Sequence, residues 1–323
     1  MKKLFSMFIP AFAVAAALLA RPAIADYKQA VAFYNQGSYD KAIQELKPDL
    51  EKNPDWEFGH RLLGLCYLNL GNNALAVSSL TRAAQLKSTA FSTYYGLGQA
   101  YFNMQKYDNC ISALNQAASL AEKEKDPERE KAKLYRLRGS AYYRLEKFSE
   151  AVNDLTNALR VNSSDATDFS MLGISYYKLN RPDEAIQALE KSLSMKPGQT
   201  TIQSVLGDIY LRKGTGALSD KKYKAAVEAL QKAEEYDPKN GYIFYNLAEA
   251  LLFEKKYSEA EKALLQSVTL MPKSAEVYRR MGLVYEMQKK WDQALNAYKQ
   301  AEKIGPSKSS KEAIKRVENN MKQ

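Results

Sequence analysis

The stretch FSMLGISYYKLNRPDEAIQALEKSLSMKP, residues 169–197, decides the fold. Its first half places Gly173 and Tyr176 on one face of a helix, and its second half does the same with Ala185 and Leu189. Between them, a proline followed by two acidic residues ends one helix and begins the next. The stretch therefore predicts an amphipathic helical hairpin. Such a hairpin has too little core to be stable alone, so it must stack on copies of itself.

A small residue recurs at intervals of 34 or 41 residues, which divides the chain into eight repeats. A large residue stands three residues after each small one. A second small residue stands twelve residues after the first small residue, or nineteen residues after it in the sixth repeat. Small side chains on both helices allow the pair to cross closely. The first small residues of the eight repeats are Ala30, Gly64, Gly98, Gly139, Gly173, Gly207, Ala248 and Gly282.

Each repeat resembles a tetratricopeptide repeat (TPR), whose pattern of Leu-Gly-x-x-Tyr, Ala, Leu and Pro is matched by Leu172, Gly173, Tyr176, Ala185 and Leu189, with a proline at the end. The resemblance implies an all-α fold over residues 26–306: a right-handed α-solenoid of stacked antiparallel helix pairs, or TPR superhelix. After it, residues 307–323 carry Ala313, Ile314, Val317 and Met321 on one helical face. These residues predict a C-terminal capping helix.

Two repeats carry seven extra residues each. The first insertion, near 121–131, is rich in charge and predicts a solvated extension of the second helix of the third repeat, ending near Pro127. The second insertion, near 214–220, contains two glycines. It predicts a loop or frayed helix between the two helices of the sixth repeat.

The first 25 residues have the layout of a secretory signal peptide. Two lysines precede an apolar run over residues 4–20, and Ala23 and Ala25 form a small-x-small cleavage site. We expect cleavage before Asp26, with an uncleaved anchor as the alternative. Residues 26–323 contain no apolar run of membrane-spanning length, so no transmembrane span is expected after signal removal. We expect a periplasmic protein, with an extracellular or envelope-associated location as the alternative.

Charge and cysteine usage narrow the range of partners. Removal of Lys2, Lys3 and Arg21 leaves 44 basic and 37 acidic residues, a net charge of +7. This mild excess favours acidic proteins or an anionic envelope surface, and we expect no nucleic acid. Cys66 and Cys110 lie on different kinds of helix, so two free, buried thiols are expected rather than a disulfide.

The sequence offers no constellation of reactive residues. His60 is the sole histidine, and its place on the packing face of a first helix predicts a structural role. Nucleotide-binding loops, HExxH and CxxC are all missing from the sequence. We therefore expect no enzyme, no cofactor and no metal site.

The resemblance implies a concave groove along the first helices, at set positions around each small residue. The middle of this groove is basic and aromatic, which suits an extended or helical peptide segment with acidic and apolar residues. Its predicted residues are Arg61, Asn69, Tyr95, Gln99, Phe102, Asn103, Arg136, Tyr143, Arg144, Tyr177, Lys178, Asp208, Arg212, Tyr245, Glu249 and Phe253.

These features predict a non-catalytic protein–protein interaction scaffold or adaptor of the cell envelope. The alternative is an accessory subunit of an envelope assembly, secretion, pilus or polysaccharide export machine. Self-association is a further expectation, because exposed groove aromatics could accept the terminal helix of a neighbouring copy.

Overall fold

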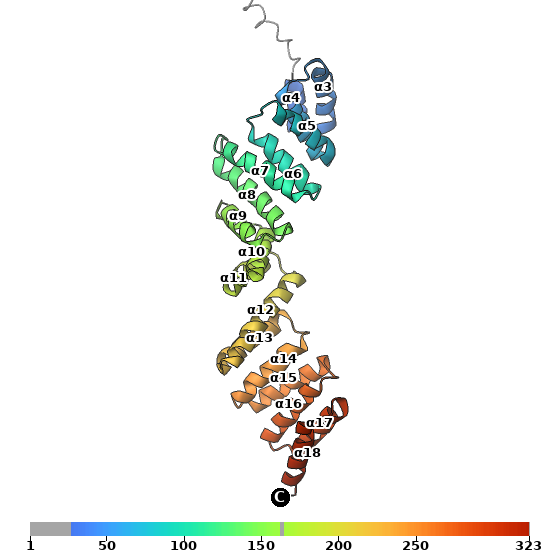
Figure 1. Ribbon diagram of the computed structural model, residues 1–323, viewed down its shortest axis with the longest axis vertical. Coiled ribbons are helices and arrows are strands. Elements are labelled where there is room, and N and C mark those ends of the chain that lie inside the picture. Colours follow the sequence, from blue (N-terminus) through green and yellow to red (C-terminus); the bar gives the residue numbers. More distant parts are fainter. Residues whose placement is uncertain (1–26, 162–164, 323) are drawn as a thin grey trace, which may run out of the picture. The chain divides into compact units, whose positions relative to one another are not determined.

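The computed structural model describes residues 27–161 and 165–322, and its only regular elements within these ranges are α-helices (Figure 1). The predicted signal peptide lies outside the described residues. The helices are α2 (Lys28–Asn35), α3 (Tyr39–Lys52), α4 (Glu57–Asn69), α5 (Asn73–Gln85), α6 (Phe91–Asn103), α7 (Tyr107–Ala121), α8 (Pro127–Arg144), α9 (Phe148–Val161), α10 (Ala166–Lys178), α11 (Pro182–Met195), α12 (Thr200–Ser219), α13 (Tyr223–Tyr236), α14 (Gly241–Phe253), α15 (Tyr257–Leu270), α16 (Ala275–Met287), α17 (Trp291–Ile304) and α18 (Lys308–Asn320).

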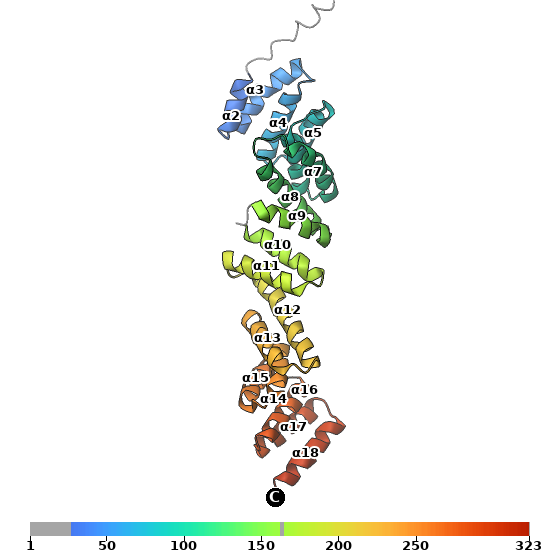
Figure 2. The same cartoon turned by 90° about the vertical axis from the view of Figure 1, so that its left-hand side faces the viewer.

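The chain divides between residues 164 and 165 into two compact units. The N-terminal unit contains α2 to α9, and the C-terminal unit contains α10 to α18 (Figure 2). Within each unit, short turns fold consecutive helices into pairs, such as α4 with α5 and α12 with α13. Each pair then packs on the next. The predicted all-α solenoid of helix pairs is therefore confirmed.

Close contact between a glycine and a leucine joins the two helices of a repeat. A Cβ atom on Gly64 would lie 2.5 Å from Cγ of Leu80, and one on Gly173 would lie 2.6 Å from Cγ of Leu189. Both leucines are fully buried. Packing therefore requires a small residue at this position, which is glycine in six repeats and alanine, at Ala30 and Ala248, in the other two.

The second insertion does not form the predicted loop. Residues Thr200–Ser219 form one continuous helix, α12. Gly214, not Gly207, packs against Leu230: a Cβ atom on Gly214 would lie 2.5 Å from Cγ of Leu230. The spacing from Gly214 to Leu230 equals that in the other repeats. The seven extra residues therefore lengthen α12 before its packing glycine, and because they make nearly two full turns, they leave its buried face in phase.

The first insertion also lies in a different helix from the predicted one. Helix α7 ends at Ala121, a charged turn covers residues 122–126, and the charged residues that follow belong to α8, which begins at Pro127. Proline suits this first position because its fixed φ is helical and its missing N–H is not needed there. The Asp126 carboxylate accepts a hydrogen bond from the backbone N–H of Arg129, over 3.2 Å, and caps α8. The insertion thus extends the first helix of the fourth repeat.

First helices of consecutive repeats touch one another in both units. Helix α4 contacts α6, and α6 contacts α8; in the C-terminal unit, α10, α12, α14 and α16 form the same series. Second helices make their main contacts with first helices instead. The first helices therefore line the inner side of each unit.

Helix α18 packs on α17 through buried Ala313 and Val317. The hydroxyl oxygen of Ser307 accepts a hydrogen bond, over 3.1 Å, from the backbone N–H of Ser310. Ser307 thereby caps the N-terminus of α18. Met321, predicted on the same apolar face, instead remains largely exposed.

Candidate partner-binding surface

The predicted groove residues of the N-terminal unit lie on α4, α6 and α8. Asn69, Asn103 and Arg144 are exposed, and the remaining six are half-buried. The two asparagines already make contacts within the chain: Asn69 donates to the carbonyl of Leu65 over 2.8 Å, and Asn103 donates to the side-chain oxygen of Asn73 over 3.0 Å. The exposed rim of this unit is therefore polar.

Arg61 and Tyr95 are less available to a partner than the sequence suggests. Arg61 forms an ion pair with Glu57 over 3.1 Å, and its guanidinium lies 4.9 Å from the ring centre of Phe58. Tyr95 stacks on Phe91 with ring centres 5.2 Å apart, and burial raises its pKa to about 12. Tyr95 therefore acts largely as a core residue.

Tyr143 and Arg144 lie side by side in the sequence at the C-terminal end of α8. The Tyr143 ring packs edge-on against Phe148, with centres 6.1 Å apart, and burial raises its pKa. The Arg144 side chain makes no hydrogen bond or ion pair within the described part of the chain. This pair combines an anchored aromatic with an available positive charge.

In the C-terminal unit, Tyr177, Asp208 and Arg212 form one cluster across α10 and α12. The Tyr177 hydroxyl donates to Asp208 over 2.7 Å, and Arg212 forms an ion pair with Asp208 over 2.8 Å. Arg212 also donates to the Tyr177 hydroxyl oxygen, over 3.3 Å. The hydrogen bond to Asp208 raises the pKa of Tyr177.

Tyr245 and Glu249 on α14 belong to a second cluster of the same kind, with Glu276 and Arg280 on α16. The Tyr245 hydroxyl donates to Glu276 over 3.3 Å. Arg280 donates to the Tyr245 hydroxyl oxygen over 3.4 Å and to Glu249 over 3.0 Å.

Sequence reasoning missed Glu276 and Arg280. Their signal is spacing: an acid and an arginine follow Tyr245 at the same intervals at which Asp208 and Arg212 follow Tyr177. Both arginines are neutralised by carboxylates of the same chain, so the inner face of this unit is less basic than the sequence predicts.

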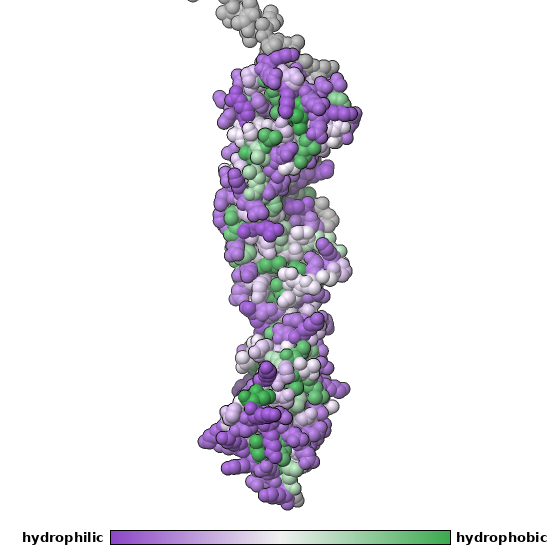
Figure 3. All heavy atoms as spheres, turned by 90° about the vertical axis from the view of Figure 1, so that its right-hand side faces the viewer, coloured by the Kyte–Doolittle hydropathy of each residue, from purple (hydrophilic) through white to green (hydrophobic). Residues whose placement is uncertain are grey.

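The remaining predicted residues differ in exposure. Lys178 and Phe253 are exposed, while Gln99, Phe102 and Arg136 are half-buried. On the face shown in Figure 3, hydrophobic residues form small patches separated by hydrophilic ones.

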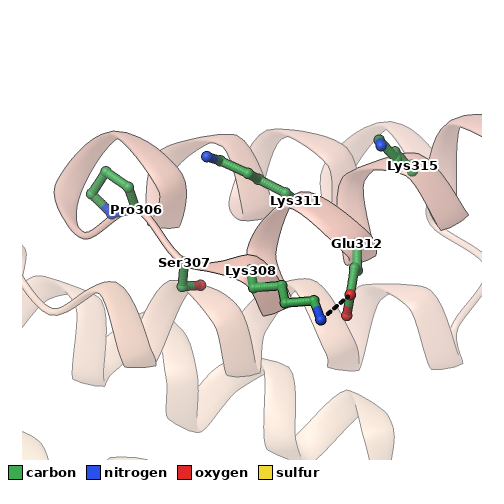
Figure 4. Close-up of a pocket in the computed structure, with 6 residues that line it drawn as sticks. All are labelled: Pro306, Ser307, Lys308, Lys311, Glu312 and Lys315. Atoms are coloured by element: carbon green, nitrogen blue, oxygen red, sulfur yellow. Dashed lines mark ion pairs between the residues drawn. The ribbon is translucent and has the colours of Figure 1, made fainter.

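The surface of the C-terminal unit has hollows of the size of small-molecule sites, two of which lie near the features described above. One, of about 190 Å³, lies beside the first cluster and is lined by Tyr177, Pro182 and Arg212 among others. The other lies at the start of α18, where Lys308 pairs with Glu312 over 3.8 Å while Lys311 and Lys315 lie along the same helix (Figure 4). The second hollow is open and lined by charged side chains, which suits solvent rather than an enclosed ligand.

His60 and the two cysteines have structural roles. The imidazole N–H of His60 donates to the carbonyl of Pro54 over 2.9 Å. Cys66 and Cys110 are buried and form no disulfide, as expected, and burial raises the pKa of each thiol to about 12. In residues 27–161 and 165–322, no three His, Cys, Asp or Glu side chains are placed to hold a metal ion. No helix in these ranges combines the length and hydrophobicity that a membrane span requires.

Solved structures similar to this chain are helical repeat proteins. A structure described as Naa15/Naa10 bound to HypK-THB has a TM-score of 0.53 at 17% identity, covering 88% of this chain and 42% of that one. The C-terminal part of a TPR repeat-containing protein from Cytophaga hutchinsonii has a TM-score of 0.47 at 15% identity, covering 90% and 99%. MamA of AMB-1 has a TM-score of 0.40 at 27% identity, covering 55% and 94%. No curated protein matches the sequence.

Five models described as tetratricopeptide repeat match successive parts of the sequence. They cover residues 62–89, 89–164, 136–199 with 170–219, 217–279 and 275–308. These matches follow the helix pairs of both compact units. The chain therefore belongs to the tetratricopeptide repeat family.

Proposed function

We propose that this chain is an exported, non-catalytic scaffold of the cell envelope that binds a partner protein segment along the inner faces of its two units. Membership of the tetratricopeptide repeat family supports protein–protein interaction in general. The observation that supports the finer proposal is the contact between consecutive first helices, because the predicted tyrosines and arginines all belong to these helices.

The inner face of the N-terminal unit supplies the strongest single anchor pair. Tyr143 is held by Phe148, so little conformational freedom is lost when a partner packs on it. Arg144 beside it is exposed and makes no ion pair within the described part of the chain. Tyrosine and arginine dominate the energetics of protein interfaces, and an acidic residue of the partner would complement Arg144.

The groove is tested by crosslinking and affinity purification from native cells. We expect Tyr143→Ala combined with Arg144→Glu to reduce partner recovery about tenfold. Gln116→Glu, on the second helix α7, is the matched control and should leave recovery unchanged. Circular dichroism should show the same helical content in all three proteins. Equal recovery by the groove variant and the wild type would remove this face from the proposal.

Export is supported by the layout of residues 1–25 and is tested separately. We expect cell fractionation to place the protein in the periplasm, and N-terminal sequencing of that protein to begin at Asp26. Recovery from the cytoplasm with an intact N-terminus would contradict export. Co-purification of secretion, pilus or polysaccharide export components would instead favour an accessory subunit of such a machine.

A further inference from the structure

An exposed apolar row occupies the C-terminal ends of three helices in the C-terminal unit, α14, α16 and α18. Phe253 ends α14, Met287 ends α16, and Met321 follows α18. These three side chains lie one repeat length apart in the sequence and are 49%, 47% and 42% exposed. Large apolar side chains half-exposed at three successive equivalent positions are unusual on a solvated surface.

The fold itself does not require this row. The same position in the N-terminal unit holds Asn69 at the end of α4, Asn103 at the end of α6 and Arg144 at the end of α8. All three are polar and exposed. In the C-terminal unit, α10 and α12 also end on exposed polar residues, Lys178 and Ser219. The repeat therefore tolerates polar residues there, and the apolar row belongs to α14, α16 and α18.

The three residues lie on neighbouring helices of the C-terminal unit. Helix α14 contacts α16, and Arg316 on α18 forms an ion pair over 2.7 Å with Glu286, the residue before Met287. Phe253 stacks on Tyr223 with ring centres 4.6 Å apart and planes 11° from parallel. One face of the Phe253 ring is thus covered and held in place, while the ring remains about half exposed.

A row of lysines accompanies the apolar row. Lys255 and Lys256 follow Phe253 in the turn after α14, and Lys289 occupies the equivalent turn after α16. All three are exposed, and their side chains make no ion pair or hydrogen bond within the described part of the chain. Lys255 and Lys289 adopt φ values of 60° and 58°, which the turn geometry imposes. The positive charges are therefore available to a ligand beside the apolar row.

We propose that this edge, made by Phe253, Met287, Met321, Lys255, Lys256 and Lys289, binds an acidic amphipathic helix of a partner protein. The inference rests on the proposed function and assigns the partner chemistry of the C-terminal unit. Packed helices lie about 8–10 Å apart, so neighbouring row residues repeat at about that distance. Two turns of an α-helix rise about 10.5 Å, so apolar residues at every seventh position of the partner match the row.

Charge complementarity predicts which residues flank the apolar stripe of the partner helix. Acidic residues beside its apolar stripe would face the unpaired lysines and speed association at low salt. Because each side chain of the row is about half covered, little apolar surface is left for insertion into lipid, and a protein surface is the better match. Binding to an anionic membrane is the competing outcome of the test.

The probe is a fluorescent synthetic helix of about 21 residues with leucine at every seventh position and glutamates beside that stripe. A twin peptide carries lysine in place of each glutamate. We expect the acidic peptide to bind the full mature chain, and its Kd to rise about tenfold or more in the triple variant Phe253→Ser, Met287→Ser, Met321→Ser. The matched control, Leu75→Ser with Leu265→Ser, replaces exposed apolar side chains on the second helices α5 and α15 and should bind like wild type.

The charge row is tested with the same peptide. Lys255→Glu with Lys289→Glu should weaken binding several-fold at about 50 mM salt and much less at about 500 mM salt. Gln105→Glu, at the equivalent turn position after α6, is the control and should have no effect.

Three results would overturn the proposal. They are equal affinity for the acidic peptide and its basic twin, unchanged binding by the triple variant, and row-dependent binding of vesicles with about one-third anionic lipid in place of the peptide. Each leaves the proposed function intact if wild-type protein still captures a partner from native cells. If the acidic peptide binds as expected but wild-type protein captures no partner from native cells, the proposed function is contradicted and the peptide-binding edge is not.

Discussion

The guanidinium of Arg316 on α18 donates two hydrogen bonds to the carboxylate of Glu286 on α16, over 2.7 and 2.8 Å. The Tyr298 hydroxyl donates a third to the same carboxylate, over 2.9 Å. Glu286 is buried, so its charge depends on these donors for stabilisation. One carboxylate thus fastens the final helix to both helices of the eighth repeat.

Removal of the Arg316 side chain should loosen α18. Arg316→Ala leaves a buried carboxylate with a single donor, and we expect a loss of about 2 kcal/mol in the stability of the last repeat. Hydrogen exchange of the α18 backbone amides measures this locally. Lys308→Ala on the same helix removes only an exposed ion pair and should change stability by less than about 0.5 kcal/mol. Equal exchange in the two variants would contradict the role assigned to Arg316.

The same site should respond to acid. Hydrogen bonds from Arg316 are the main cause that lowers the pKa of Glu286. Because the pKa is lower in the folded than in the unfolded chain, the stabilisation is complete at neutral pH and is lost as pH falls through the folded value. We expect the difference in melting temperature between wild type and Glu286→Gln to be largest at neutral pH and to disappear below about pH 4. A difference in melting temperature that stays constant as the pH falls below about 4 would show that Glu286 acts by packing alone.

Asp154 and Arg138 form a buried ion pair in the N-terminal unit. Arg138 donates to both carboxylate oxygens over 2.7 and 2.9 Å, and the Asp154 side chain is 1% exposed. Asp154→Ala leaves the guanidinium with its hydrogen bond to the side-chain oxygen of Asn115, over 2.7 Å, and we expect a loss of about 2–3 kcal/mol in urea unfolding of this unit. The control is Asp108→Ala, which removes an exposed pair with Lys147 and should cost less than about 1 kcal/mol. A small effect of Asp154→Ala would indicate that water reaches the pair.

Two glycines of α12 test the corrected register of the sixth repeat. Gly214→Ala places a Cβ 2.5 Å from Cγ of Leu230 and should destabilise the C-terminal unit by about 1–3 kcal/mol. Gly216 is helical with open space around a built Cβ, so Gly216→Ala should stabilise it by about 0.5–1 kcal/mol. Urea unfolding compares the two variants. Opposite signs are expected, whereas a projecting loop at 214–220 would tolerate both changes equally.

Cys66 and Cys110 should resist modification in the folded protein. Both are buried, and burial raises the pKa of each thiol to about 12, so little thiolate forms at neutral pH. We expect intact-mass measurement to show no iodoacetamide adduct on the native chain and two adducts after denaturation without reductant. A denatured chain that still resists alkylation would reveal a disulfide.

Much of the fold follows from local sequence pattern. The recurrence of a small residue, with a leucine sixteen residues later, determines a glycine–leucine contact such as Gly64 with Leu80 because both partners lie within one hairpin. Helix existence, pairing within a repeat and the burial of Cys66 and Cys110 depend on these short-range relations. They could therefore be predicted from the sequence.

The position of the second insertion required the tertiary structure. Gly207 and Gly214 are seven residues apart, which is almost two helical turns, so both satisfy the same periodic pattern. The sequence signals conflict: a large residue follows Gly207 at the usual interval, whereas Leu230 follows Gly214 at the interval found in the other repeats. The contact of Gly214 with Leu230 decides between them, and it depends on where the second helix crosses the first. Likewise, Pro127 can end one helix or begin the next, and packing decided that it begins α8.

The sequence by itself determined that this protein is a stack of TPR hairpins, because hairpin formation depends on residues close together in the chain. The tertiary structure alone decided which surface charges are available. Arg280 pairs with Glu249 across helices from different repeats, so the charge available there depends on how repeats stack. Arg212 pairs with Asp208 within α12, and stacking adds its contact with Tyr177. Stacking likewise brings the helices that carry Phe253, Met287 and Met321 together, through the α14–α16 contact and the pair of Arg316 with Glu286.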